Sequence, residues 1–303
     1  MLKCCDVIGS SHGLLCLYGF YDKPVAVLWN VSIRKAVSVV VPNIDNEMIY
    51  ETALGFGVCR ETNDPKIVKI TRLKRTANIE SRACIPPQVE VFTLSTRDWR
   101  SSYTTNLPRK SIQFHHYQEV VDGFLYWLAT DRIAMDGGFR LYNLIISFNM
   151  TSEEFREVNL PDTLHMPAYN LSMSKLRESL VALKHCEDVT VFVVWMMEDG
   201  APKSFTKLFT VNSPDATMLR VLGFRKSGES VVEIIKSVVE YDSLAFYEPC
   251  SKHINSLGIN GVRGSFSMYP YMETLLLLDH PDFIIYDKGE ATLQSGELGA
   301  EGL

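Results

Sequence analysis

Short runs of hydrophobic residues recur along the chain, and each is too short for an ordinary helix. They are rich in β-branched and aromatic residues, which is typical of buried or half-buried strands. Four runs end in a related pattern of an aromatic residue, a polar turn and charge: "LWNVSIRK" (28–35), "FTLSTRDW" (92–99), "FNMTSEEF" (148–155) and the weaker "YEPCSKHI" (247–254). A second short strand follows most copies, so each copy predicts an antiparallel hairpin whose polar residues form the turn.

The spacing of these copies predicts a repeat. The leading aromatics stand at positions 29, 92, 148 and 247, with gaps of 63, 56 and 99 residues. The last gap is nearly double, and Trp195 in "VTVFVVWMMEDG" divides it into 47 and 52. The first gap holds Thr76–Gln88, whose paired prolines and polar residues are typical of a loop insertion. The chain therefore repeats about every fifty residues.

A further strand containing glycine or small residues precedes most hairpins, at 13–19, 53–59, 122–129 and 178–185. Three to four strands in each unit of about fifty residues are typical of a β-propeller blade. We therefore predict an all-β β-propeller over residues 1–288, with six blades of antiparallel strands. Residues 289–303 lack aromatics and β-branched runs and are predicted to be a disordered tail.

Two segments are ambiguous, because Leu171–Leu183 and Gly228–Glu240 also fit amphipathic helices. The period demands strands at both places, and we predict mainly strand. Asp282–Lys288 is expected to complete a blade with the N-terminal strands, which would remove two exposed edges.

The repeated aromatics are predicted to pack between neighbouring blades, as Trp29, Phe92, Phe148 and Tyr247. Seven positions after two of them, Trp99 and Phe155 are predicted to pack on the return strand of the same hairpin. Asn30 and Ser32 are interpreted as turn residues. Arg34 and Arg97 are candidates for bonds between blades.

Composition and charge narrow the function classes. The 303-residue chain is 46% hydrophobic and 22% charged, with a net charge of −6, which argues against electrostatic attachment to nucleic acid or an anionic membrane. The basic cluster Lys66–Arg75 alternates with apolar residues as a half-exposed strand would, so we interpret its charges as a solvated face.

Three further features of the sequence predict an intracellular protein, cytoplasmic or nuclear. No segment approaches the ~18 uncharged apolar residues that would span a bilayer. Polar residues at 6 and 10–12 interrupt any signal-peptide core near the N-terminus. Seven scattered cysteines without a C-x-x-C pair are interpreted as apolar fillers in a reducing compartment.

Candidate catalytic groups are few. His115–His116 have no third ligand at metal spacing. "GSSHG" (9–13) has the form of a nucleophile elbow, but a strand rather than a helix is predicted to follow it. "GINGVRG" (258–264) joins no strand to a helix and is interpreted as a flexible loop between blades. We therefore predict no catalytic, cofactor-binding or metal-binding residue, no cofactor and no enzyme.

The order of the motifs resembles a known family. "GSSHGLLCLYG", "VLWNVSIRK", "VEVFTLSTRDWR", "VVDGFLYWLA", "IISFNMTSEEFREVNLP" and "LAFYEPCSKHINSLGI" follow one another as in the plant F-box-associated domain, a kelch-related β-propeller module. The resemblance covers about residues 4–287. It implies a protein–protein interaction module that recruits a protein substrate, of unknown identity, to a Skp–cullin–F-box ubiquitin ligase.

The resemblance leaves the F-box itself unaccounted for. An F-box would precede "CDVIGSSHG", and only Met1–Lys3 come before the matching region. A Skp-type adaptor is therefore expected as a partner only if an upstream F-box exists.

The substrate is expected to bind loops at one face of the propeller. Candidate loops are Asn43–Glu51, Thr76–Gln88, Asp131–Arg140 and Asn212–Ser227. Two alternatives remain open. One is a propeller hydrolase that uses Asp131 or Asp136 in a central channel, and the other is a non-functional remnant of an F-box gene.

Overall fold

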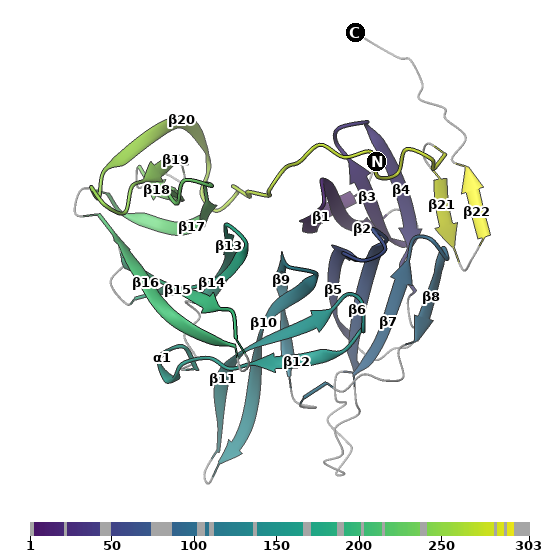
Figure 1. The fold of residues 1–303 in the computed structure, drawn as a ribbon, viewed down its shortest axis with the longest axis horizontal. Helices are drawn as coiled ribbons and strands as arrows, with labels where there is room; N and C mark the ends of the chain where they lie inside the picture. The colour runs from purple at the N-terminus through teal and green to yellow at the C-terminus, as the bar shows by residue number, and fades with distance from the viewer. Residues whose placement is uncertain are drawn as a thin grey trace. The chain divides into compact units, whose positions relative to one another are not determined.

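A computed structural model describes residues 3–20, 23–42, 50–73, 87–101, 107–108, 112–135, 138–165, 171–186, 191–200, 203–213, 216–236, 241–281, 284–287 and 290–293. The chain divides into two compact units, residues 1–104 with 270–303, and residues 105–269. Within the described ranges the structure is all-β apart from one short helix, α1 (Asp162–His165) (Figure 1). None of the described helical residues forms a segment long and apolar enough to cross a membrane.

The first unit contains two sheets. The first sheet consists of β1 (Lys3–Ser11), β2 (Leu14–Phe20), β3 (Pro24–Asn30), β4 (Lys35–Val40), β21 (Ile284–Asp287) and β22 (Glu290–Leu293), in that order. The second sheet consists of β5 (Tyr50–Val58), β6 (Pro65–Leu73), β7 (Gln88–Thr93) and β8 (Asp98–Ser101). Apolar side chains of both sheets, including Leu28, Val39, Phe56 and Ile67, share one buried core.

The second unit contains three four-stranded sheets. The third sheet of the chain consists of β9 (Gln113–Val121), β10 (Phe124–Met135), β11 (Gly138–Asn149) and β12 (Phe155–Val158). The fourth consists of β13 (Leu171–Leu176), β14 (Ser179–His185), β15 (Val191–Glu198) and β16 (Ser204–Asn212). The fifth consists of β17 (Met218–Phe224), β18 (Ser230–Ile235), β19 (Tyr241–Tyr247) and β20 (Ile254–Val262). Consecutive sheets share apolar cores.

The described residues form five sheets, each built mainly from consecutive antiparallel strands. The fold is therefore an all-β β-propeller, and the described residues form five blades. The prediction of six blades was wrong. The physical reason lies at the C-terminal end, where residues 264–281 contain no strand and β21–β22 extend the first blade instead of forming another. The region predicted as a disordered tail includes β22, while residues 294–303 lie outside the described part of the chain.

The C-terminal strand joins the N-terminal blade, as the sequence predicted for 282–288. β21 pairs in parallel with β4, with Ile285 opposite Ser38. The strand therefore covers the outer edge of the first blade, and β22 becomes the new edge. Both ambiguous segments are also strands, since β13–β14 and β18 lie within them. The glycine segment 258–264 is mostly the end of β20, so its interpretation as a flexible loop was wrong.

The repeated hairpin turn has one backbone geometry. Its fifth position after the aromatic is left-handed in all four copies, with φ of 56° at Arg34, 58° at Arg97, 59° at Glu153 and 58° at Lys252. In two copies an asparagine accepts hydrogen bonds from backbone N–H groups two and three residues later. The asparagines therefore stabilise the turn by local bonds. The Ser32 hydroxyl, predicted to bond nearby backbone, instead lies 3.2 Å from Tyr271 Oη. Arg34 and Arg97 both occupy this turn position.

The aromatic positions of the repeat mostly behave as predicted. Phe92, Phe148 and Tyr247 are at most 1% exposed. Phe92 packs on Trp99 with ring centroids 5.6 Å apart, and Phe148 packs on Phe155 at 4.8 Å.

The burial predicted for Trp29 was wrong, because its side chain is 37% exposed. Its partner across the hairpin is Ala36, whereas Phe92 and Phe148 each face an aromatic residue. The first copy therefore has no aromatic pair in its hairpin, and its large side chain lies at the surface.

Residues 66–73 of the basic segment lie in β6, but the described lysines do not form a solvated face. Lys66 is 8% exposed and Lys69 is 3% exposed. The Lys69 Nζ donates to Glu90 Oε2 at 2.8 Å and to the carbonyl of Pro42 at 2.6 Å. A buried cation requires such partners, and they come from neighbouring segments that local alternation does not reveal.

Candidate partner-binding surface

In the first unit, residues 271–280 form a segment without regular secondary structure, which we call the strap (Figure 1). The fully buried Asn30, at the end of β3, holds its centre. The Asn30 Nδ2 donates to the carbonyl oxygens of Thr274 at 3.0 Å and Leu276 at 2.7 Å. The Oδ1 of the same side chain accepts from the N–H groups of Ser32 and Ile33. One amide thus fixes both a hairpin turn and the strap.

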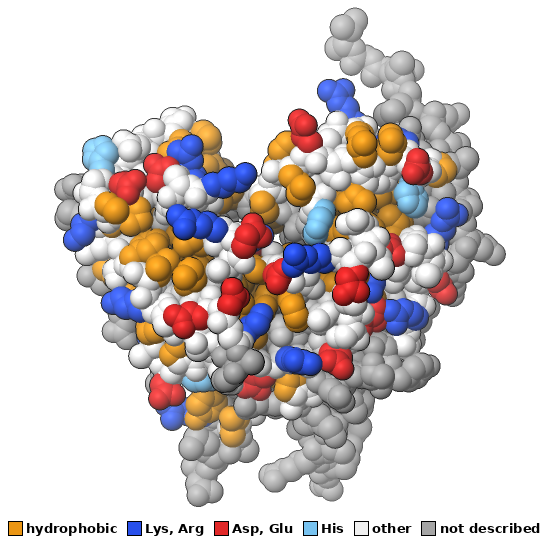
Figure 2. Space-filling model, in the orientation of Figure 1, with side chains coloured by type: hydrophobic (Ala, Val, Ile, Leu, Met, Phe, Trp, Pro, Cys, Tyr) orange, Lys and Arg blue, Asp and Glu red, His pale blue; other side chains and the backbone are white. Residues whose placement is uncertain are grey.

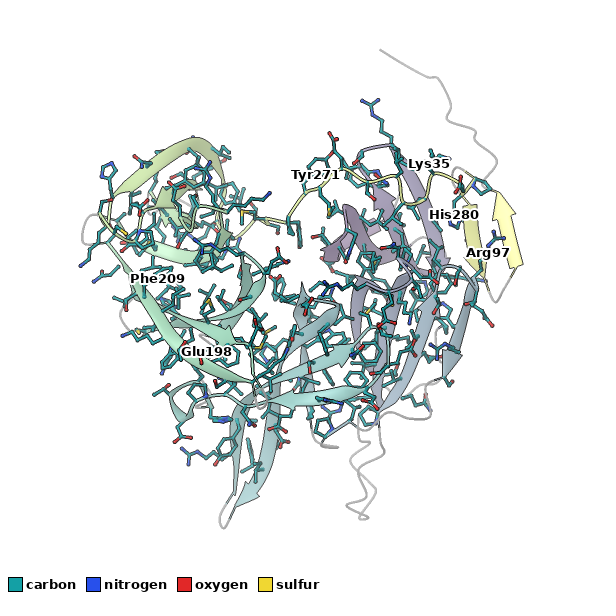
Figure 3. All side chains as sticks on the ribbon, viewed as in Figure 1. Lys35, Arg97, Glu198, Phe209, Tyr271 and His280 are labelled. Atoms are coloured by element: carbon teal, nitrogen blue, oxygen red, sulfur yellow. The ribbon has the colours of Figure 1, made fainter. Side chains whose placement is uncertain are left out.

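Two further residues of the same turn hold the ends of the strap. The Lys35 Nζ donates to the carbonyls of Leu278 at 2.7 Å and His280 at 2.9 Å. At the other end, Ser32 Oγ lies 3.2 Å from Tyr271 Oη, within hydrogen-bond distance. Figure 3 shows Lys35, Tyr271 and His280 along this segment. The turn that the sequence predicts as local architecture is therefore the anchor of a distant segment.

The strap also inserts a side chain into the core of the first unit. Leu277 is 4% exposed and belongs to the apolar cluster between the first two sheets. Its φ of 72° is left-handed, a strained conformation for a bulky residue. The surrounding hydrogen bonds and the burial of this side chain hold that conformation in place.

Gly13 allows the strap to approach the first hairpin closely. A Cβ at this position would lie 2.3 Å from the carbonyl oxygen of Met272 and 2.7 Å from Thr274 Cγ2. The residue also has φ +79° in the turn between β1 and β2. Both observations require glycine here.

The outward side of the strap is apolar. Tyr271, Met272, Leu275 and Leu278 are 62%, 53%, 69% and 49% exposed, respectively. In the space-filling view, hydrophobic side chains reach the surface where the strap crosses the first blade (Figure 2). Because the strap backbone is fixed by hydrogen bonds, these side chains are presented with little backbone freedom to lose on binding. Exposed apolar side chains gathered in one place are typical of protein interaction sites.

Burial and nearby charges shift the pKa of His280, at the end of the strap. Burial lowers its pKa below the usual 6.5, and the positive charge of Arg97 lowers it further. Asp279 and Asp64 act in the opposite direction, while Lys35 adds to the lowering. Asp64 accepts a bond from the backbone N–H of Ser95, in the turn between β7 and β8, at 3.0 Å. The strap end therefore carries little of the positive charge that a histidine could bring.

The described candidate catalytic residues lie on two neighbouring strands of the third blade. His115 and His116 lie on β9, and Asp131 lies on β10, the second strand of its blade, where it is 2% exposed. Asp136 lies outside the described residues. No group of three or more His, Cys, Asp or Glu side chains suited to a metal ion occurs in the described ranges.

The "GSSHG" motif is a strand–turn–strand in the first blade. Ser11 ends β1, and His12–Gly13 form the turn to β2. The backbone N–H of Val58 donates to Ser11 Oγ at 3.1 Å, which links the first hairpin to the second blade. The interpretation of this motif as structural is supported, since no helix follows the serine.

The candidate binding loops have mixed outcomes. Residues 43–49, 74–86, 136–137 and 214–215 lie outside the described part of the chain. Most of Asp131–Arg140 belongs to β10 and β11, and much of Asn212–Ser227 is β17, so these two segments are not loops. The strap, which the sequence did not single out, carries four exposed apolar side chains. A run of four leucines after an aromatic pair, "YPYMETLLLL", was the available signal.

Sheets of consecutive antiparallel strands define the scaffold as a β-propeller. Residues 3–253 match the model of the F-box associated beta propeller domain, so the chain belongs to that family.

Curated relatives are F-box proteins of Arabidopsis thaliana. F-box protein CPR1 is 24% identical over 291 residues, which cover 90% of this chain and 68% of the relative. F-box/kelch-repeat protein At3g23880 is 25% identical over 211 residues, which cover 68% of this chain and 52% of the relative. The match thus spans about half the length of the second relative.

Similarity to solved structures is weaker. A luciferin-regenerating enzyme has a TM-score of 0.45 and 9% identity, over 82% of this chain and 72% of the enzyme. At this level the likeness carries no argument about function.

Proposed function

We propose that this chain is the substrate-recognition domain of an F-box protein, and that it binds a protein partner inside the cell. Membership of the F-box associated family carries the proposal. The strap supports it, because exposed apolar side chains sit there on a backbone fixed by Asn30 and Lys35. The partner would bury part of this apolar surface.

Leu275 is the side chain through which to test the strap, because it is the most exposed of the four apolar residues there. The full chain with a proximity-labelling tag would be expressed in plant cells as wild type and as Leu275→Asp. We expect the variant to lose at least one protein that the wild type labels strongly, because a charge in an apolar contact opposes its burial.

Leu208→Asp provides a matched control, since Leu208 is 43% exposed on β16 in the other unit. The control is expected to retain the labelled protein, and all three chains are expected to melt at the same temperature. A labelled set that is identical for the wild type and both variants would contradict a partner site on the strap. Failure of the folded wild type to label any specific protein would support the gene-remnant hypothesis instead.

The ligase step needs a second experiment. A Skp-type adaptor is expected to bind the chain only after an F-box is fused in front of it, because the adaptor contact belongs to the F-box in the proposed assembly. The fusion, reconstituted with the adaptor and cullin, is expected to ubiquitinate the protein that the strap captures. Absence of ubiquitination despite adaptor binding and capture would contradict the substrate-receptor role and leave a simple binding module.

A further inference from the structure

The strands β10 and β11 continue past the rest of their sheet. β9 pairs with β10 from Gln113, opposite Thr130, onward, and β12 pairs with β11 from Ile145 onward. Beyond these points β10 and β11 remain paired with each other, from Asp131 opposite Tyr142 to Met135 opposite Gly138. We call residues 131–135 and 138–142 the ribbon, and Figure 1 shows it projecting from the third blade.

Each face of the ribbon combines an arginine with an aromatic ring. On one face the Arg132 guanidinium lies 3.3 Å from the ring centroid of Phe139, across the strand pair. On the other face Arg140 lies 5.4 Å from the ring centroid of Tyr142. Stacking on a ring fixes the plane of a guanidinium, and a guanidinium in a fixed plane is suited to binding carboxylates.

Apolar side chains accompany these cations at the surface. Phe139 is 53% exposed and Ile133 is 38% exposed. Among the described residues no strand pairs with β11 on its outer side at 138–142. Helix α1 closes that edge at Asn143, whose Nδ2 donates to the carbonyl of Leu164 at 3.1 Å. The outer edge of β11 therefore offers a short, bounded run of backbone next to paired cationic and apolar side chains.

We infer that the ribbon binds an extended protein segment in which acidic residues alternate with apolar ones. The inference rests on the proposed function and specifies the partner chemistry for a second surface. The segment would add to the outer edge of β11 through backbone hydrogen bonds. Its carboxylates would meet Arg132 on one face of the ribbon, and its apolar side chains would cover Ile133 on the other face.

Charge and hydrophobicity together favour a protein segment over nucleic acid. The chain as a whole has a net charge of −6, which opposes a polyanion with uniform charge. A short acidic segment needs only local complementarity, and the exposed Phe139 and Ile133 need apolar contacts that phosphate groups do not supply.

Fluorescence anisotropy of a labelled peptide provides the test. The probe is a twelve-residue peptide in which Glu alternates with Val, and the protein is the full chain. We expect saturable binding, weakened at least tenfold by Arg132→Glu, which removes the cation, and by Phe139→Ser, which removes the ring that holds the Arg132 guanidinium. Arg156→Glu is the matched control, because Arg156 lies on β12 of the same blade with a side chain that is 75% exposed. Its affinity is expected to stay within twofold of the wild type.

Three results would overturn the inference. One is equal binding of a Lys–Val peptide, a second is displacement of the probe by a twelve-nucleotide oligo-dT, and a third is equal affinity of Arg132→Glu and wild type. Melting temperatures of all variants verify that they are folded. Because the strap experiment uses Leu275 and a cellular partner, the ribbon can fail while the proposed function stands.

Discussion

Two copies of the repeated turn, at Asn30 and Asn149, have different roles in this molecule. Asn30 and Asn149 each accept backbone hydrogen bonds from the residues two and three positions later. Only Asn30 also donates to a distant segment, through its bonds to Thr274 and Leu276. The aromatic residues beside them differ as well, since Phe148 is fully buried and Trp29 is 37% exposed.

The comparison separates what a turn motif specifies from what its surroundings add. The accepting oxygen of the asparagine acts within the motif, so the motif alone predicts it. The donating nitrogen needs a partner 244 residues away, and nothing in "LWNVSIRK" identifies that partner. A repeated motif can therefore build every blade and still anchor the strap in one of them.

The largest expected effect on stability comes from truncating the aromatic residues of these two turns, Phe148 and Trp29. Phe148→Ala should lower the free energy of unfolding by about 3–5 kcal/mol, because a fully buried ring in contact with Phe155 is removed. Trp29→Ala should cost about 1 kcal/mol, because the side chain is already partly in water. Urea denaturation of both variants measures the difference. Equal losses of stability in the two variants would show that Trp29 is buried in solution. The two aromatic residues would then no longer differ.

The two asparagines give the next largest difference. Asn30→Asp keeps the accepting oxygens but loses the donor and places a carboxylate against two carbonyl oxygens, for a loss of about 2–4 kcal/mol. Asn149→Asp retains every bond that the structure assigns to its side chain, so its stability should change by less than about 1 kcal/mol. Denaturation curves at pH 7.5 check both variants. A harmless Asn30→Asp would refute the anchoring of the strap by this residue.

A smaller, pH-dependent effect is expected at the strap end. Since the pKa of His280 in the folded state lies below 6.5, the folded chain binds fewer protons there than the unfolded chain. Stability contributed at this site is therefore complete above pH 6.5 and is lost as the pH falls through the folded-state pKa. His280→Gln should lose less stability than wild type between pH 7.5 and 5.5, as measured by chemical denaturation. A larger loss of stability in the variant would contradict the lowered pKa of His280.

The smallest effect concerns the left-handed turn position. Arg34→Gly removes the cost of a left-handed residue, roughly 1 kcal/mol, but adds backbone entropy to the unfolded chain. The net change should stay within about 1 kcal/mol, and Lys252→Gly in the fifth blade should behave alike. Thermal melts of the two variants compare them. A loss of stability in Arg34→Gly but not in Lys252→Gly would show that the Arg34 side chain makes a stabilising bond that the turn geometry does not require.

The sequence predicts those features that depend on nearby residues. Spacing of the aromatics indicated the blades, and the seven-residue interval indicated the contact of Phe92 with Trp99. Turn chemistry at Asn30 and Asn149 was visible for the same reason. Each of these contacts joins residues of one hairpin, so local pattern and local structure agree.

Features that depend on distant residues were missed. The burial of Lys69 is possible because Glu90 and the carbonyl of Pro42 supply its partners, and the alternating pattern of β6 contains neither. The blade count depended on the average spacing, which cannot show that β21 adds to an existing blade. The strap was missed because its hydrogen bonds use its own carbonyl oxygens, which every residue type provides.

The parallel pairing of β21 with β4 has a consequence for synthesis on the ribosome. β4 leaves the ribosome long before β21, since about 240 residues separate them. At roughly 5–20 residues per second, the outer edge of β4 stays without its final neighbour for roughly 12–50 seconds. An open strand edge over that interval is a site for mispairing with other nascent chains. The first blade to be synthesised is thus among the last to be completed, and it is the one for which chaperone protection matters most.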